Sequence, residues 1–417
     1  MRSEHLLPDG MLGALFAIEG VQGAVTILNG PTGCKYYPAS LSDSMIRREI
    51  SFNPLRHVSE FYFGQSRLPC TYMDTNDYVM GAEEKLKRIF AAAEAESPEL
   101  IGVVNSPGAS LIGERLPVHS DKIPVVRLES PGYSESVGEG YQRGNLALLE
   151  ALDLSPVETQ KKRVNLVGLS IWHLGWQDSL SDLSSLLSLC GIEVGAAIGL
   201  GWSVDQIRES AGSALNVVVD ADFSDGICRW YEEELEVPSF SIGRSPLGFA
   251  ALEEWVDGIC SRLNADSSPA REKILEARRL AYREIHRLNT ASGLPRGRSF
   301  SLMANSSLAL PLLEVLHTYL GMTPNVLQPV FGDSALLRDY LRSHGLEGLL
   351  GEIAEAEADL VLADGNTVAS MMARDLSDNG IDVMHPGLRS VQLRPEPLLG
   401  LGGTMRLLDM TLNSLAR

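Results

Sequence analysis

The chain has 417 residues, which is more than one hydrophobic core usually supports, so two or three domains are expected. It carries 35 lysine and arginine residues against 54 aspartate and glutamate residues, and this gives a formal net charge of -19. Such an acidic chain is not expected to bind the phosphate backbone of a nucleic acid.

The N-terminal sequence MRSEHLLPDG lacks the long apolar core and small-residue cleavage site of a secretory signal. No window of the chain reaches the roughly 18 to 20 apolar residues of a membrane span. We therefore expect a cytoplasmic protein with no membrane partner.

Short β-rich runs alternate with helical stretches along the chain. A helix is expected at 81–95, and the expected strands are 24–30, 100–106, 164–170, 192–200, 215–221, 299–304, 324–330 and 358–365. Alternation of this kind predicts parallel strands joined by crossover helices.

The fold class expected is therefore α/β, with three tandem doubly wound, Rossmann-like parallel-sheet domains. The stretch 267–289 has densely alternating charge and predicts a long solvated helix with i,i+4 pairs. We place the boundaries near residues 160 and 290, which gives domains 1–160, 161–290 and 291–417. The charged helix closes the second domain.

The loop NGPTGCKYYP (29–38) follows a predicted strand, and its glycines allow a close approach of the backbone while Cys34 projects from it. Taken alone, Cys34 fits a buried structural cysteine in a tight turn better than it fits a ligand. The chain has no GxxxxGK[ST] motif, so it is not expected to bind ATP in a P-loop.

The five cysteines are odd in number, widely spaced and free of any CxxC pair, which disfavours a disulfide framework. We expect reduced thiols, some of them metal ligands. Cys190 and Cys260 fall on predicted helices and fit core thiols.

Five blocks in chain order resemble the nitrogenase component 1 family. In the first block DGMLGA and NGPTGC resemble the "C-x-PLGA" and "HGPxGC" elements of that family's cluster-binding opening, and the other four resemble its later patterns. The blocks are 7–34, 69–86, 101–116, 237–256 and 385–415.

This resemblance implies three doubly wound α/β domains and an iron-sulfur cluster where the first domains of two subunits meet. It also implies a separate Fe-protein-like ATPase reductase that supplies electrons. Both a homodimer and a heterodimer with a related subunit remain open.

The family's cluster ligands transfer only in part. Cys34 matches the "HGPxGC" cysteine, the "C-x-PLGA" cysteine falls on Asp9, and a third family cysteine falls on Pro107, which has no donor atom. Asp9 is a candidate oxygen ligand, and an ordinary helix N-cap is an equal alternative.

Cys70 is a candidate second thiolate, and the alternative is a small buried residue at a strand end. Two chains that each give Cys34 with Cys70, or Cys34 with Asp9, would supply four ligands to a [4Fe-4S] cluster at a two-fold interface. An eight-iron cluster held by six thiolates is not expected.

The molybdenum-iron cofactor of nitrogenase is not expected either. The resemblance places Asp220 where the cofactor cysteine would be, Cys228 at a position that is not a ligand, and His385 away from the cofactor histidine.

Several polar and aromatic residues follow predicted strands, where doubly wound domains bind ligands. His173 lies among Trp172, Trp176 and Trp202, which suit either a tetrapyrrole or simple packing between domains. Weak candidates for proton supply or for anchoring carboxylates are Asp220, Asp222, Arg244, Asn366 and His385, and His173 joins Asp220 and His385 as a weak catalytic candidate.

The sequence therefore predicts a nitrogenase-like reductase subunit that receives electrons through an interface [4Fe-4S] cluster. Its substrate is a tetrapyrrole or a small sulfur or nitrogen compound. A non-catalytic scaffold for metallocofactor assembly is the alternative from a different class.

Overall fold

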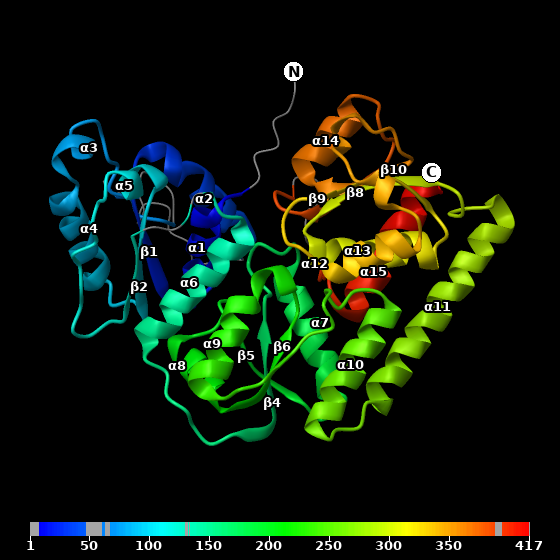
Figure 1. The fold of residues 1–417 in the computed structure, drawn as a ribbon, viewed down its shortest axis with the longest axis horizontal. Coiled ribbons are helices and arrows are strands. Elements are labelled where there is room, and N and C mark those ends of the chain that lie inside the picture. The colour runs from blue at the N-terminus through cyan, green and yellow to red at the C-terminus, as the bar shows by residue number, and fades with distance from the viewer. Residues whose placement is uncertain are drawn as a thin grey trace.

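The computed structural model describes residues 8–46, 61–62, 67–129, 132, 134–387 and 394–416, and these residues form three parallel sheets. The sheet orders are β1-β2-β3, β5-β4-β6-β7 and β11-β10-β8-β9. Each sheet with the helices around it is called a unit, and the three units are numbered in chain order. Figure 1 shows the first sheet on the left, the second at the lower centre and the third at the upper right.

The strands are β1 (Ala24–Asn29), β2 (Leu100–Asn105), β3 (Val125–Leu128), β4 (Gln160–Val167), β5 (Glu193–Ala197), β6 (Ser213–Val218), β7 (Ser239–Phe240), β8 (Ser299–Ala304), β9 (Thr323–Pro329), β10 (Leu360–Asp364) and β11 (Gly380–Met384). The α-helices are α1 (Gly10–Glu19), α2 (Thr32–Met45), α3 (Asp77–Met80), α4 (Glu83–Ala95), α5 (Pro107–Leu111), α6 (Val137–Leu152), α7 (Trp176–Ser188), α8 (Val204–Glu209), α9 (Asp225–Leu235), α10 (Phe249–Leu263), α11 (Ser268–Ser292), α12 (Ser306–Leu313), α13 (Ala335–Ser343), α14 (Gly365–Ala373) and α15 (Gly400–Leu415).

The second and third sheets each have a switch point. There, the strand that comes second in the chain lies on one side of the first strand, and the strand that comes third lies on its other side. In the second sheet it lies between β4 and β6, and in the third between β8 and β10. Ligands of doubly wound proteins bind beyond the carboxyl ends of strands at such points. The segments after these four strands are therefore where a site is expected.

The helix α1 is buried along its whole length and packs against α6. Its sequence GMLGALFAIE is apolar on nearly every side, as expected for a helix surrounded by protein. Asp9 caps its first turn, since Oδ1 accepts a hydrogen bond from the backbone nitrogen of Leu12 at 3.1 Å.

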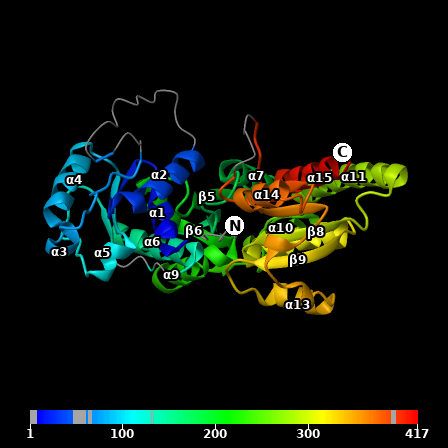
Figure 2. The same ribbon diagram turned by 90° about the horizontal axis from the view of Figure 1, so that it is seen from above.

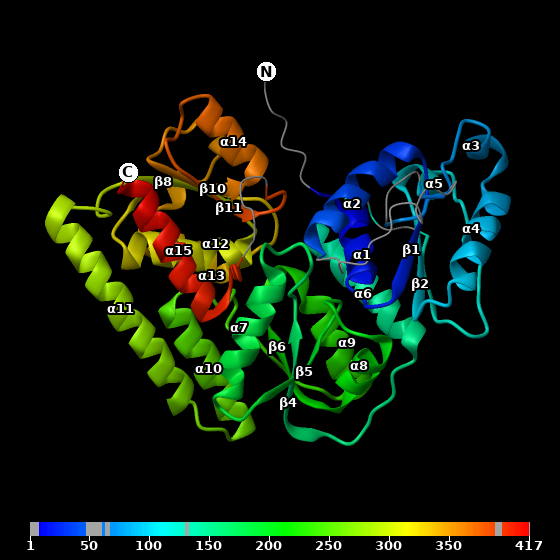
Figure 3. The same ribbon diagram turned by 180° about the vertical axis from the view of Figure 1, so that it is seen from behind.

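The C-terminal helix α15 packs against α7, α10 and α11, although it follows the third sheet in sequence. Figures 2 and 3 show α15 beside the long helix α11 at the edge of the molecule. The chain therefore returns from the third sheet to helices that flank the second.

The predicted fold class is confirmed, and all eight predicted strands are present. The prediction missed β3, β7 and β11, which have four, two and five residues and lie at sheet edges. Short edge strands bury fewer side chains and carry a weaker hydrophobic pattern.

The domain boundaries near 160 and 290 stay a prediction: residue 160 begins β4, and α11 extends to Ser292. Residues 1–7 at the start of the first domain and residues 388–393 of the last motif block lie outside the described residues.

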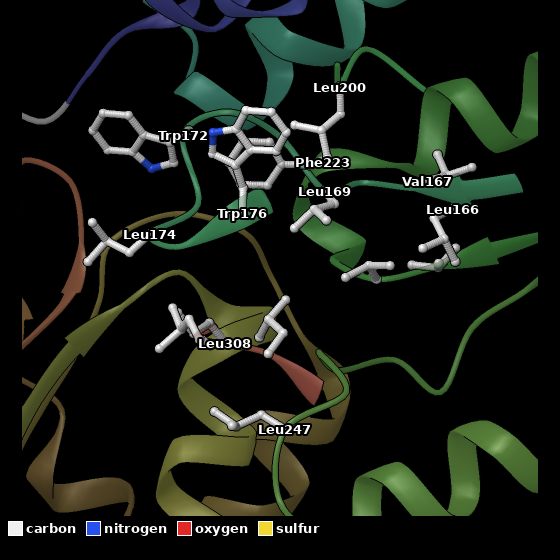
Figure 4. Packing of buried hydrophobic residues seen from close by; sticks show 14 of the residues in the cluster. Leu166, Val167, Leu169, Trp172, Leu174, Trp176, Leu200, Phe223, Leu247 and Leu308 are labelled. Carbon is white, nitrogen blue, oxygen red and sulfur yellow. The ribbon is translucent and has the colours of Figure 1, made fainter. Parts of the chain in front are cut away.

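One continuous hydrophobic core runs through the interface between the second and third sheets. Figure 4 shows Trp172, Trp176 and Phe223 from the second unit above Leu247 and Leu308.

Within the described residues, no helix has the length and hydrophobicity needed to cross a membrane.

The close packing of α1 on α6 predicts that Gly144→Ala destabilises the protein. A methyl group there would lie 2.7 Å from the Cβ of Ala17 and 2.8 Å from the carbonyl oxygen of Ala14. We expect the free energy of unfolding in urea to fall by about 1–3 kcal/mol through overpacking. Gly348→Ala is the control because its added methyl group meets nothing within 4 Å. Equal stability of the two variants would contradict this account.

Candidate functional site

A cavity of about 470 Å³ lies where the three units meet. The first unit contributes Asp9, Cys34 and Tyr37, and the second contributes Trp172. The third contributes mainly residues that follow its strands, including Asp364, Asn366 and His385. In Figures 1 and 3, α2 and α14 lie on the same side of the second sheet. The cavity volume falls within the roughly 300–1,000 Å³ typical of small-molecule sites.

The loop that carries Cys34 is fixed by hydrogen bonds at the carboxyl end of β1. The side chain of Asn29 donates to Asn105 at 2.9 Å and accepts from the Thr71 hydroxyl at 2.9 Å. The Thr71 oxygen in turn accepts from the backbone nitrogen of Gly30 at 3.0 Å. These contacts set where α2 begins, and they place Cys34 in its first turn on the cavity wall.

Cys34 and Asp9 both line the cavity, and the charge of Asp9 acts on Cys34. Burial raises the pKa of the Cys34 thiol, and the charge of Asp9 raises it further. Burial also raises the pKa of Asp9, opposed by the backbone N–H of Leu12. Capping of α1 engages Oδ1 of Asp9, and a carboxylate has a second oxygen for another partner.

Cys70 lies behind this wall and is fully buried. Its Sγ donates to the carbonyl oxygen of Gly30 at 3.1 Å and accepts from the backbone nitrogen of Tyr72 at 3.4 Å. Burial raises the pKa of the Cys70 thiol to about 11. Cys70 is therefore close to the Cys34 loop but is not among the residues that line the cavity.

Three rings link the three units at the cavity. Trp172, just after β4, stacks on Phe16 of α1 with ring centroids 6.0 Å apart, and its other neighbour is the His385 ring at 5.7 Å. Burial lowers the pKa of His385 to about 3, and the nearby His173 acts in the same direction. His385 is therefore neutral at physiological pH, and its Nδ1 accepts from the backbone nitrogen of Gly387 at 3.3 Å.

His173 and Asp220 face each other across the switch point of the second sheet. Nδ1 of His173 lies 3.0 Å from the backbone nitrogen of Ser170 and 3.3 Å from its carbonyl oxygen, and the acceptor Asp220 beside Nε2 favours a ring proton on Nε2. This Nε2 lies 3.2 Å from Oδ2 of Asp220, a fully buried carboxylate. Both side chains are buried, neither is among the residues that line the cavity, and they bond to each other.

Asn305, directly after β8, connects this pair to a second carboxylate. Its Nδ2 donates to Asp220 at 2.9 Å and to Asp222 at 2.8 Å. Burial raises the pKa of Asp222 to about 7, the charge of Asp220 adds to the rise, and the N–H of Ser307 opposes it. This network joins the carboxyl ends of β4, β6 and β8.

The remaining residues that the sequence singled out lie in different parts of the structure. Asn366 lines the cavity. Trp176 is buried elsewhere and donates to the carbonyl oxygen of Met45 at 2.8 Å, while the carbonyl of Trp202 accepts from the backbone nitrogen of Gln22. Arg244 forms ion pairs with Glu254 and Glu314.

Three residues of this region were missed in the sequence. Lys35 and Tyr37 follow Cys34 within the motif NGPTGCKYYP, and proximity to Cys34 was a signal for both. Asn305 follows a predicted strand directly, which is the same signal that singled out Asp220.

A family model described as nitrogenase component 1 type oxidoreductase matches residues 10–416. The chain belongs to this family. It is therefore a nitrogenase-like oxidoreductase.

Curated relatives include two proteins that are named as the same component of light-independent protochlorophyllide reductase. The protein of Synechococcus sp. (strain WH7803) is 27% identical over 84% of this chain and 67% of the relative. That of Synechococcus sp. (strain CC9605) is 24% identical over 95% of this chain and 77% of the relative.

Solved structures of nitrogenase Cp1 share the fold. The structure at pH 6.5 has a TM-score of 0.74 at 14% identity and covers 97% of this chain and 91% of that chain. The structure at pH 5 has a TM-score of 0.71 at 17% identity and covers 98% and 88%.

The donor set at the cavity fits the iron-sulfur cluster that the nitrogenase-like family implies. Cys34 offers a thiolate and Asp9 a carboxylate on one wall. Within the described residues, no group of three His, Cys, Asp or Glu side chains is arranged to hold a metal ion. One chain therefore presents two donors at this wall, which is half of a four-ligand site.

The raised pKa of Asp222 predicts a pH-dependent stability. Between about pH 4 and pH 7 the folded state keeps a proton that the unfolded state releases, so the free energy of unfolding falls as pH rises through this window. Asp222→Asn should remove this slope, by at most about 1.4 kcal/mol per pH unit. Urea unfolding from pH 4 to pH 8 measures it.

Asp205→Asn is the matched control, because the side chain of Asp205 is 87% exposed. This variant should keep the slope of the parent protein. Parallel curves for the parent and Asp222→Asn would contradict the raised pKa.

Proposed function

We propose that this chain is the substrate-reducing subunit of a nitrogenase-like reductase, with a [4Fe-4S] cluster at Cys34 and a tetrapyrrole as substrate in the adjacent cavity. The observation that carries the proposal is that Cys34 and Asp9 line the same cavity as Trp172 and His385. One cavity is therefore lined both by the proposed cluster ligands and by the residues proposed to contact the substrate.

Electrons would come one at a time from an Fe-protein-like ATPase partner, and the cluster supplies one-electron transfer to the cavity. In this proposal the chain gives Cys34 and Asp9, and a partner chain of the same fold, identical or related, gives the other two ligands. Cys70 supports the loop from behind, because its sulfur already bonds to Gly30 and Tyr72.

Exposed apolar side chains on the first unit favour such a pairing. Tyr36, next but one to Cys34, is 65% exposed, and Val79, Met80 and Leu111 are 79%, 84% and 72% exposed. Burial, and then the charge of Cys34, raises the pKa of Tyr78, so α3 reaches the surroundings of Cys34. Apolar surface of this kind marks contacts between subunits.

The cavity suits a flat, mostly apolar ligand with few polar anchors. Trp172 presents an indole ring, and neutral His385 offers a hydrogen-bond donor at Nε2 rather than an acidic proton. Asn366 adds a side-chain amide. The relatives named as components of protochlorophyllide reductase support a tetrapyrrole over small sulfur or nitrogen compounds.

The proposal includes no molybdenum-iron cofactor. Asp220, which takes the position of the cofactor cysteine, is fully buried and hydrogen-bonded to His173, Asn305 and the backbone nitrogen of Asp222. These bonds occupy the carboxylate that would have to serve as a ligand.

The first test is iron and sulfide quantitation after anaerobic purification, with EPR of the reduced protein. We expect roughly four irons per dimer in the parent protein and loss of iron in Cys34→Ala. Asp9→Asn keeps a good helix cap but removes the carboxylate, so loss of iron in this variant identifies Asp9 as a ligand. Cys70→Ala should keep its iron.

Cys228→Ala is the matched control, a buried thiol on α9. A folded parent dimer without iron under strict anaerobiosis would overturn the proposal. Rapid transfer of the cluster to an acceptor protein, without turnover by the reductase partner, would favour an assembly scaffold.

The second test concerns the cavity. Asn366→Trp should fill part of it and weaken binding of protochlorophyllide at least about tenfold, a change of roughly 1.4 kcal/mol. Quenching of tryptophan fluorescence measures the affinity. Ala369→Trp, on the same helix at an exposed position, is the control and should bind like the parent. Equal affinities of the two variants would place the ligand elsewhere.

A further inference from the structure

Lys35 is a buried lysine next to Cys34, and the proposed function does not use it. Its side chain is among the largest that are fully buried, with 1% exposed. Lysine is almost never buried to this degree unless it has a partner. The surroundings of Lys35 must therefore compensate its charge.

The bonding partners of Lys35 are neutral oxygens that accept hydrogen bonds. Nζ donates to the carbonyl oxygen of Tyr62 at 2.6 Å and to the hydroxyl of Tyr72 at 2.9 Å. The Tyr72 hydroxyl itself donates to the carbonyl oxygen of Phe61 at 3.1 Å, so it acts as an acceptor toward Lys35. Acceptors of this kind suit an ammonium group, which has three donors and no acceptor.

The charge effects on Lys35 come from one thiol and one carboxylate, those of Cys70 and Asp43. Burial lowers the pKa of Lys35 to about 8, and the strongest opposing effect comes from Cys70, ahead of Asp43. Besides the rise caused by burial, Lys35 lowers the pKa of Cys70 and Cys34 raises it. The Lys35 ammonium group and the Cys34 thiol therefore each act on Cys70, whose sulfur is hydrogen-bonded to Gly30 in the loop that carries Cys34.

We propose that Lys35 is a fixed positive charge beneath the Cys34 loop that raises the reduction potential of the iron-sulfur cluster held there. This inference rests on the proposed function and deepens it. Reduction adds one electron to a cluster whose thiolate ligands are already negative, so a nearby cation stabilises the reduced form more than the oxidised form. Because the charge is buried, solvent and salt screen it little.

Lys35 is a positioning residue in this account, since it acts on the cluster without binding it. A negative cluster would add a counter-charge, beside the weaker effect of Asp43, for a buried cation whose hydrogen-bond partners are uncharged. Helix α2 places the two residues on different sides: Cys34 on the cavity wall and Lys35 toward the protein interior.

The test is an EPR-monitored redox titration of the reduced dimer, with iron content measured on the same samples. In Lys35→Met the midpoint potential should become more negative while the iron content stays that of the parent. Lys35→Arg keeps the charge and should stay close to the parent. Lys87→Met, an exposed lysine paired with Glu83 and Glu84, is the control and should leave the midpoint unchanged.

The shift in Lys35→Met should persist at high salt, which distinguishes a buried charge from a surface effect. If Lys35→Met does not fold, Lys35→Gln keeps a donor for the Tyr62 carbonyl and should show the same negative shift. A full cluster with an unchanged midpoint in the uncharged variant overturns the role of Lys35 and leaves the proposed function standing. A parent protein without iron overturns both.

Discussion

The hydrogen bonds around Asp220 determine how the second and third sheets meet, and the cavity depends on that junction. This carboxylate is fully buried and joins His173 after β4, Asn305 after β8 and the backbone after β6. A buried charge is tolerated only when such partners surround it. The junction is therefore specific, because another arrangement of the two sheets would leave the carboxylate without its donors.

A second consequence is electrostatic. The third sheet and α14 bring His385 and Asp364 to the cavity, and the first unit brings Asp9. His385 is neutral through burial, while Asp364 is hydrogen-bonded by the first turn of α14. In the proposed arrangement the charge that changes during turnover would be that of the cluster held by Cys34 and Asp9, with Lys35 as a buried positive charge behind it.

Much of the fold was readable from the sequence, because buried parallel strands have continuous apolar runs between helices. The edge strand β7 was not, since two residues carry no pattern. Cys34 and Asp9 could be found from motif spacing, and the structure brings them to one wall. Spacing could not tell that Trp172 lines the cavity while Trp176 and Trp202 lie elsewhere, because the direction of a side chain depends on turns that the pattern does not specify.

Lys35 is another residue whose side-chain direction cannot be predicted from the sequence. A lysine beside a cysteine in a loop reads as a solvated charge, and only the three-dimensional structure shows that its side chain enters the interior toward Tyr62 and Tyr72. Cys34 and Lys35 are neighbours in sequence but face different environments, one a cavity and the other the protein core. A cluster held by Cys34 would face the cavity on one side, with the buried cation of Lys35 behind its loop on the other. The Cys34 loop would then both hold the cluster and set the driving force for its reduction.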